Sequence, residues 1–324
     1  MNKLFFLSLF ILCLFLQTAV SQTSITHYQV TTGIGKQASK QLIVLRSFEN
    51  KGTPMYFAVD AQTLETQVIP AKSVVFQAMK WGDLQKTFAE LPYFKALSYA
   101  VTQAQSLQDA GITHGYPAEK GITLTVDLCP SAKPLDRSIF TSLITEFRKI
   151  EQPVPIGLSI SGKFLNTHTA DIQWLKKLES DGQIRITWIN HTYTHYYDPK
   201  TPLPENFLLK PGTDLNYEIL QTEIDMLQNG LMPSVFFRFP GLVSDNSIVD
   251  KITNYGLIPI GSDAWLAKGQ RSEPGSIVLI HGNGNEPIGV QDFIRLLQTE
   301  KEQVLNKQWL LYDLSESVGD EFGE

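Results

Sequence analysis

Hydrophobic and polar positions divide the chain into two stretches of different periodicity. Between about residues 24 and 80 the pattern is mostly that of β-strands, and residues 50–53 lie between two apolar runs, which predicts a hairpin turn. Residues 84–110 then follow helical spacing, interrupted near Pro92, and Gly111 is a predicted helix stop. This first stretch therefore predicts a small α+β unit, and it carries no evident chemical motif.

From residue 121 onward, short apolar runs alternate with helical patterns. The predicted strands are residues 122–126, 156–160, 184–189, 235–237, 257–260, 277–280 and 309–312, and the predicted helices are residues 136–150, 170–178, 214–228, 246–255 and 290–305. This alternation indicates a parallel sheet with helices outside it. The units would close, or nearly close, into a (β/α) barrel; an open doubly wound sheet is the alternative. A glycine-rich phosphate loop is absent after the first strand, so nucleotide binding has little support.

Residues 1–21 have the organisation of a secretory signal peptide. Lys3 precedes an apolar run from Leu4 to Val20, and small residues stand just before Gln22. A retained membrane anchor is the alternative, because the run is nearly long enough to span a bilayer. We expect cleavage before Gln22 and export to the periplasm or the cell exterior, with no stable membrane insertion afterwards.

Composition narrows the partners and the domain plan. The 27 basic and 33 acidic residues leave no basic patch, which argues against nucleic acid as a partner. Cys129 is the only cysteine after residue 21, so no intramolecular disulfide is expected, and we interpret it as a small buried hydrophobic residue. The predicted domains are a signal peptide (1–21), the α+β unit (22–114) and the barrel (115–324). No pattern indicates an oligomeric state.

Chemically reactive side chains follow five of the predicted strands. In chain order they are Asp127, His191 with His195, Arg238, Asp263 and His281. The C-terminal ends of parallel barrel strands converge on one face, where active sites are built from several strands, so we expect most of these side chains to meet. Imidazole is the commonest side-chain metal ligand, and histidines four residues apart share one face of a helical turn. His191 and His195 are therefore predicted metal ligands.

These segments resemble, in the same order, the five motifs of the polysaccharide deacetylases, that is, family 4 carbohydrate esterases or the NodB-homology domain. The resemblance covers about residues 115–324 and implies a distorted (β/α) barrel. Residues 125–130 are similar to the motif Thr-Phe-Asp-Asp-Gly-Pro, residues 191–195 to the metal-binding motif, residues 238–241 to Arg-x-Pro-Tyr, residues 262–265 to a shortened fourth motif and residues 279–281 to the last motif.

The resemblance implies a role for each matching residue. Asp127 is the expected catalytic base, Arg238 the residue that orients it, and His281 the general acid. His191 and His195 would hold a divalent metal, zinc by preference, with cobalt or nickel as alternatives. The implied activity is that of an exported hydrolase of carbon–nitrogen (non-peptide) bonds. It would remove acetyl groups from an N- or O-acetylated polysaccharide or oligosaccharide, with metal-bound water as the nucleophile.

The chain departs from the family pattern at two positions. The second, metal-binding aspartate of the first motif is replaced by Leu128, and the tyrosine of the third motif by Gly241. We predict Asp136 as the first candidate for the missing third ligand, because only a short loop separates it from the first strand, and Asp198 as the second. The alternative function is that of a catalytically silent protein of deacetylase fold that binds glycan.

Overall fold

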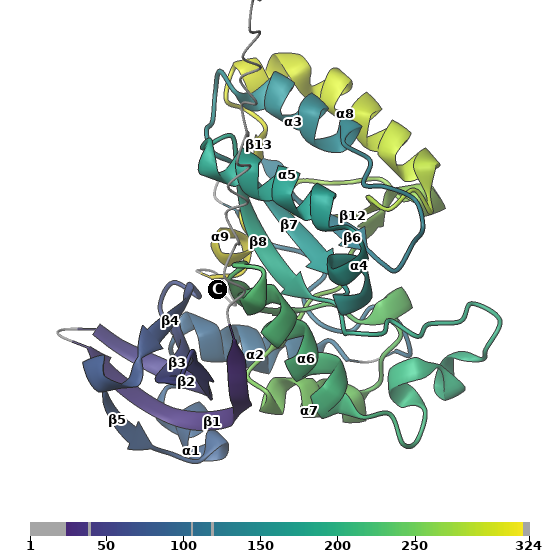
Figure 1. The fold of residues 1–324 in the computed structure, drawn as a ribbon. Coiled ribbons are helices and arrows are strands. Elements are labelled where there is room, and N and C mark those ends of the chain that lie inside the picture. Colours follow the sequence, from purple (N-terminus) through teal and green to yellow (C-terminus); the bar gives the residue numbers. More distant parts are fainter. Residues whose placement is uncertain (1–23, 38–39, 105, 118–119, 320–324) are drawn as a thin grey trace, which may run out of the picture.

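The computed structural model describes residues 24–319 except 38–39, 105 and 118–119 (Figure 1). The predicted signal peptide lies outside the described residues. Among the described residues no helix combines the length and the apolar character needed to cross a membrane.

The described part of the N-terminal unit is a five-stranded antiparallel sheet with two α-helices and one short 3₁₀ helix. Its strands are β1 (Ile25–Gln37), β2 (Lys40–Asn50), β3 (Thr53–Asp60), β4 (Thr66–Pro70) and β5 (Val75–Ala78), in the order β4-β3-β2-β1-β5, and its helices are η1 (Ala71–Ser73), α1 (Trp81–Thr87) and α2 (Pro92–Thr102). The predicted hairpin turn is confirmed, because Lys51 and Gly52 both have positive φ between the paired residues Asn50 and Thr53.

The helical region predicted at residues 84–110 consists of two shorter helices. Pro92 stands at the first position of α2, where its missing N–H costs no hydrogen bond, so it starts a helix here. The prediction that a helix stops at Gly111 is wrong, because α2 already ends at Thr102. Gly111 has φ +101°, and a Cβ there would lie 2.3 Å from the carbonyl oxygen of Pro259. The glycine therefore permits a close approach between the N-terminal unit and the second sheet.

The second sheet is parallel throughout. Its strands are β6 (Gly121–Leu128), β7 (Val154–Ile160), β8 (Ile184–Asn190), β9 (Pro233–Phe237), β10 (Ile258–Pro259), β11 (Ala264–Trp265), β12 (Ile277–His281) and β13 (Leu310–Leu311). The order is β10-β9-β8-β7-β6-β12-β11, and β13 pairs with β6. The sheet curls without pairing β10 to β11 in the described part of the chain, so the expected distorted (β/α) barrel is confirmed and remains incompletely closed.

Helices cover the outside of this sheet. They are α3 (Ser138–Phe147), α4 (Gly162–Thr167), α5 (Thr169–Ser180), α6 (Leu215–Gln228), α7 (Asn246–Asn254) and α8 (Pro287–Leu305). Helix α9 (Leu314–Gly319) lies instead on the inner face, where Ser317 contacts Thr123 of β6. The short turns are η2 (Leu203–Glu205), η3 (Phe207–Leu209), η4 (Pro240–Leu242) and η5 (Leu266–Lys268). Figure 1 shows α3 and α8 side by side on the outer face. The five predicted helices are confirmed. The patterns did not predict α4 and α9, which are too short to display helical periodicity.

Side-chain alternation along β6 separates the core from the site. Leu124, Val126 and Leu128 belong to the apolar cluster between the sheet and the helices, whereas Thr125 and Asp127 are buried on the opposite face of the strand. Successive side chains of a strand point to opposite faces, so this division follows from the pleat. The chemistry-bearing positions of β6 therefore face the inside of the curl.

The N-terminal sheet shares a core with the barrel. A single apolar cluster contains Leu45 and Phe57 of the first sheet together with Phe236 and Ile258 of the second. A buried ion pair crosses the same boundary: the Arg46 guanidinium donates two hydrogen bonds of 2.8 Å to the carboxylate of Glu223 in α6. The two parts are thus joined by packing and by a specific polar contact.

The environment of the Glu151 carboxyl group, just after α3, predicts that the stability of the fold depends on pH. One of its carboxylate oxygens is buried without a hydrogen-bond partner. Burial, reinforced by the charge of Glu316, raises the pKa of Glu151 from 4.5 to about 7. The folded chain therefore holds this proton more tightly than the unfolded chain, so the contribution of this group to stability falls as pH rises from 4.5 to about 7.

The substitution Glu151→Gln is expected to raise the melting temperature at pH 8 and to leave it nearly unchanged at pH 4. Thermal unfolding at both pH values measures the effect, and Glu90→Gln is the control because the Glu90 side chain is 91% exposed. An equal shift of melting temperature at both pH values would contradict the assignment of this titration to Glu151.

Candidate functional site

Four of the predicted residues meet where strands of the barrel end. Asp127 at the end of β6 is the register partner of His281 at the end of β12. Arg238, just after β9, lies with Nη1 3.1 Å from Oδ1 of Asp127, and Nε2 of His191, just after β8, lies 3.7 Å from Oδ2. The structure therefore brings these side chains from four strands to one place.

Arg238 holds Asp127 in position and in its charged form. The arginine is fully buried, and it also donates hydrogen bonds to Thr125 Oγ1 (2.7 Å) and to the carbonyl of Gly261 (2.8 Å). Burial by itself would raise the pKa of Asp127, but the positive charge of Arg238 and the interactions with His191 and His281 outweigh it and lower the pKa below the usual value. Asp127 is thus an ionised carboxylate at neutral pH.

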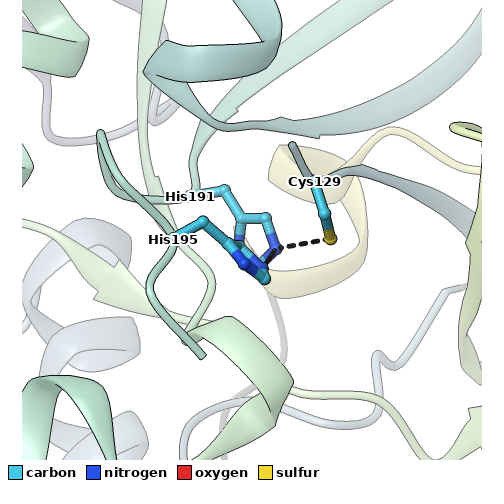
Figure 2. Close-up of side chains that lie close together, drawn as sticks. All are labelled: Cys129, His191 and His195. Atoms are coloured by element: carbon cyan, nitrogen blue, oxygen red, sulfur yellow. Dashed lines mark hydrogen bonds between the residues drawn. The ribbon is translucent and has the colours of Figure 1, made fainter. Parts of the chain in front are cut away.

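His191, His195 and Cys129 form a compact group of metal-type donors (Figure 2). Nδ1 of His191 lies 2.9 Å from the carbonyl oxygen of Arg238; this assigns the N–H to Nδ1 and leaves the lone pair of Nε2 directed at the group. Nε2 of His191 lies 3.0 Å from Nε2 of His195 and 3.7 Å from Sγ of Cys129. All three donor atoms lie within 4.8 Å of one another.

The loop that carries the histidines is held by a residue that the sequence did not single out. Thr192 and His195 both have positive φ, which costs a non-glycine residue about 1–3 kcal/mol. The carboxylate of Glu218 in α6 accepts hydrogen bonds from the backbone N–H groups of Tyr193 (3.0 Å) and Thr194 (2.8 Å). Glu218 is buried and stabilises this turn, but nothing in the periodicity of α6 distinguishes it from a solvent-facing glutamate.

His281 is held as a proton donor. Its Nδ1 forms an ion pair at 2.8 Å with Oε2 of Glu286, without the geometry of a hydrogen bond, and the same oxygen accepts a hydrogen bond from Nε1 of Trp265. Burial by itself would lower the pKa of His281, but contacts with Cys129 and Glu286 outweigh it and raise the pKa well above the usual value. The ring of Trp265 lies beside the imidazole, with centroids 5.7 Å apart.

These groups open into a cavity of about 720 Å³. It is lined by Cys129, Pro130, Lys163, residues 194–199, Gly241, Trp265, Lys268, His281, Asn285 and Glu286. Its size is that of a typical ligand pocket, and aromatic side chains such as Tyr196 stand at its rim. A bound molecule could therefore reach His195 and His281 from outside.

Two acidic residues that the sequence analysis named, Asp136 and Asp263, lie outside this group of side chains. Asp136, our first candidate for the third ligand, instead accepts hydrogen bonds from the backbone N–H and the hydroxyl of Ser138 at the start of α3. Asp263 lies at the start of β11, where it pairs with His114 at 2.6 Å and accepts from the backbone of Ile277. Its carboxylate is therefore engaged at the opposite end of β12 from His281.

Asp198 reaches the cavity rim, but its carboxylate accepts hydrogen bonds from Thr201 and the backbone of Lys200. Cys129, interpreted from the sequence as a small buried hydrophobic residue, stands with the histidines instead of these acids. Side chains alternate between the two faces of a strand, and Cys129, directly after β6, stands two positions after Asp127. This alternation is the sequence signal that could have identified Cys129.

Comparisons with known proteins give one family match and several similar solved structures. Residues 26–99 match a family described as the RP012 protein N-terminal domain. Solved structures similar to the chain are family 4 carbohydrate esterases. One from Streptomyces lividans has 16% identity and a TM-score of 0.44, covering 63% of this chain and 97% of that one. One from Bacillus anthracis has 16% identity and a TM-score of 0.47, covering 68% and 90%.

A further similar structure is a family 4 pseudoenzyme from Bacillus anthracis, with 15% identity and a TM-score of 0.44 over 65% of this chain and 70% of that one.

Proposed function

We propose that this chain is an exported, metal-dependent hydrolase that removes acetyl groups from an N- or O-acetylated glycan. The observation that carries the proposal is the meeting of an ionised carboxylate, an imidazolium and a pair of imidazole donors beside one accessible cavity, which is lined by His195 and His281 of this group. Removal of residues 1–21 before Gln22 belongs to the same proposal, because a glycan of the cell envelope lies outside the cytoplasm.

The donor set fits a divalent metal. Nε2 of His191 and Nε2 of His195 face each other, and the first imidazole is oriented through its other nitrogen, as is usual for metal-binding histidines. These two residues would hold the ion, with Cys129 as the third donor of the group. When bound, a divalent ion such as zinc polarises the acetyl carbonyl and lowers the pKa of a water.

The residues of the chain supply the proton transfers. Asp127 would accept the proton of the attacking water, and Arg238 keeps that carboxylate ionised and fixed. His281 would donate its proton to the leaving nitrogen or oxygen of the sugar, and Glu286 keeps it protonated for that step. General acid–base help of this kind is typically worth about 10²–10⁴-fold in rate for each group.

Acetate release tests this function. Zinc-loaded protein is expected to liberate acetate from at least one of three probes: N-acetylglucosamine oligomers, peptidoglycan or O-acetylated xylan. His191→Ala is expected to lose bound metal and to reduce acetate release by more than about 100-fold. His27→Ala is the matched control, because the His27 side chain is 77% exposed on the N-terminal sheet.

Acetate release that survives His191→Ala unchanged would contradict the proposed site. Binding of the same glycans without acetate release, by protein that carries metal, would favour the silent glycan-binding alternative. Protein that neither holds zinc nor binds or deacetylates any probe would contradict both functions.

A further inference from the structure

We infer that Cys129 is the third protein ligand of the metal, so that the ion is held by one thiolate and two imidazoles instead of the carboxylate and two imidazoles that the sequence resemblance implies. The inference rests on the proposed function, and it concerns the residue that substitutes for the missing aspartate.

The pleat of β6 places Cys129 and not Leu128 in the pocket. Leu128 is fully buried in the apolar cluster under the helices, and its Cδ2 would lie 3.0 Å from a Cβ on Gly282. Cys129, two residues after Asp127, returns to the side of the strand on which Asp127 lies. A carboxylate at position 128 would point into hydrocarbon, whereas the next side chain meets the two histidines.

The backbone around Cys129 is fixed, so the position of the sulfur is defined. The side-chain amide of Asn283, a fully buried residue after β12, donates a 2.9 Å hydrogen bond to the carbonyl of Cys129. The backbone N–H of Ser161 donates to the carbonyl of Leu128 from the other side. Cys129 itself is 6% exposed and lines the pocket, so its sulfur is shielded from bulk water yet open toward His191 and His195.

Among the residues that the structure describes, this is also the one group of three or more histidine, cysteine or acidic side chains arranged to hold a metal. Binding one ion would move the two imidazole nitrogens slightly apart from their present 3.0 Å, and all three donor atoms already lie within 4.8 Å of one another. Catalytic zinc sites typically have three protein ligands and one open position, and cysteine with histidine is among the sets that they use.

The donor set predicts metal preference. A thiolate carries the same single negative charge as the carboxylate that it replaces, so the total charge of the site is conserved. Sulfur is a softer donor, which favours zinc and cobalt over magnesium, calcium and manganese. We therefore expect this site to discriminate more strongly against hard ions than a carboxylate-containing site would.

The experiment uses the full chain with Cys13→Ser, which leaves Cys129 as its only cysteine. X-ray absorption of the zinc-loaded protein is expected to show one sulfur at about 2.3 Å together with nitrogen or oxygen neighbours at about 2.0–2.1 Å. The cobalt-loaded protein is expected to show a near-ultraviolet sulfur-to-cobalt charge-transfer band. Neither signal depends on activity.

Two variants of Cys129 separate the role of the sulfur from that of the fold. Cys129→Ala is expected to lose the sulfur signal and to bind zinc at least about 10–100-fold more weakly, the range that loss of even a supporting residue causes. Cys129→Asp restores an anionic donor on the same face, and it is expected to recover much of the zinc affinity without the sulfur signal. Circular dichroism and thermal unfolding report whether each variant is folded.

Several outcomes overturn the inference. Zinc bound by the parent protein through nitrogen and oxygen alone would exclude Cys129 as a ligand while leaving the proposed deacetylase intact. The same conclusion follows if Cys129→Ala binds zinc as tightly as the parent. Detection of an acetylated Cys129 during turnover by mass spectrometry would assign the sulfur to covalent catalysis instead. Failure of the parent to bind zinc at all would overturn both this inference and the proposed function.

Discussion

Replacing Asp127 by asparagine is expected to lower kcat for acetate release by about 10²–10⁴-fold while the protein keeps its metal and its fold. The amide has nearly the shape of the carboxylate, so the hydrogen bond from Arg238 can persist, but it cannot accept a proton from water. Initial rates on the best glycan probe measure the effect, and zinc content and thermal unfolding measure what is retained.

The matched control for this substitution is Asp263→Asn. Asp263 is also an aspartate that follows a strand, but its carboxylate pairs with His114 and the backbone of Ile277, at the opposite end of β12 from His281. The control is expected to leave kcat within about twofold, and any loss of stability appears in its thermal unfolding. Asp127→Asn with near-parental turnover on a true substrate would show that another group takes the proton.

The second large effect concerns stability. Arg46→Ala is expected to lower the free energy of unfolding by about 3–5 kcal/mol, because it leaves the buried carboxylate of Glu223 without its cation and with the Tyr28 hydroxyl (2.9 Å) as its remaining side-chain partner. The exposed fractions of the two side chains are 0% and 1%, and the guanidinium also donates a 2.7 Å hydrogen bond to the carbonyl of Tyr255. Urea unfolding of the parent and the variant gives the difference.

A double substitution distinguishes the cost of an unpaired charge from the contribution of the pair. Arg46→Met combined with Glu223→Leu replaces both charges by apolar groups of similar size, and it is expected to be much less destabilising than Arg46→Ala alone. Because the two sheets share a core at this boundary, we expect the parent to unfold in one transition. Separate transitions for the two parts, with Arg46→Ala neutral, would show that the ion pair does not join them.

Periodicity and strand-end chemistry were readable from the sequence because they are local. Apolar runs alternating with amphipathic helices indicated the parallel sheet, and the convergence of strand ends predicted that Asp127, His191, Arg238 and His281 would meet. The turn at residues 50–53 was predictable in the same way, because a two-residue hairpin loop requires positive φ, which Lys51 and Gly52 adopt. In each case a short stretch of chain contains the whole physical reason.

The identity of the third donor and the support of the site depended on contacts between segments distant in sequence. Sequence proximity favoured Asp136, but that carboxylate is satisfied by Ser138 at the start of a helix. Glu218 stabilises the strained histidine loop from another element, 24 and 25 residues away from its partners. From the sequence alone we could expect the barrel, a catalytic acid, a catalytic base and a pair of metal-binding histidines. Only the tertiary structure decided that Cys129 shares their pocket, because strand pleat and cross-strand packing, not distance along the chain, select which side chains face one another.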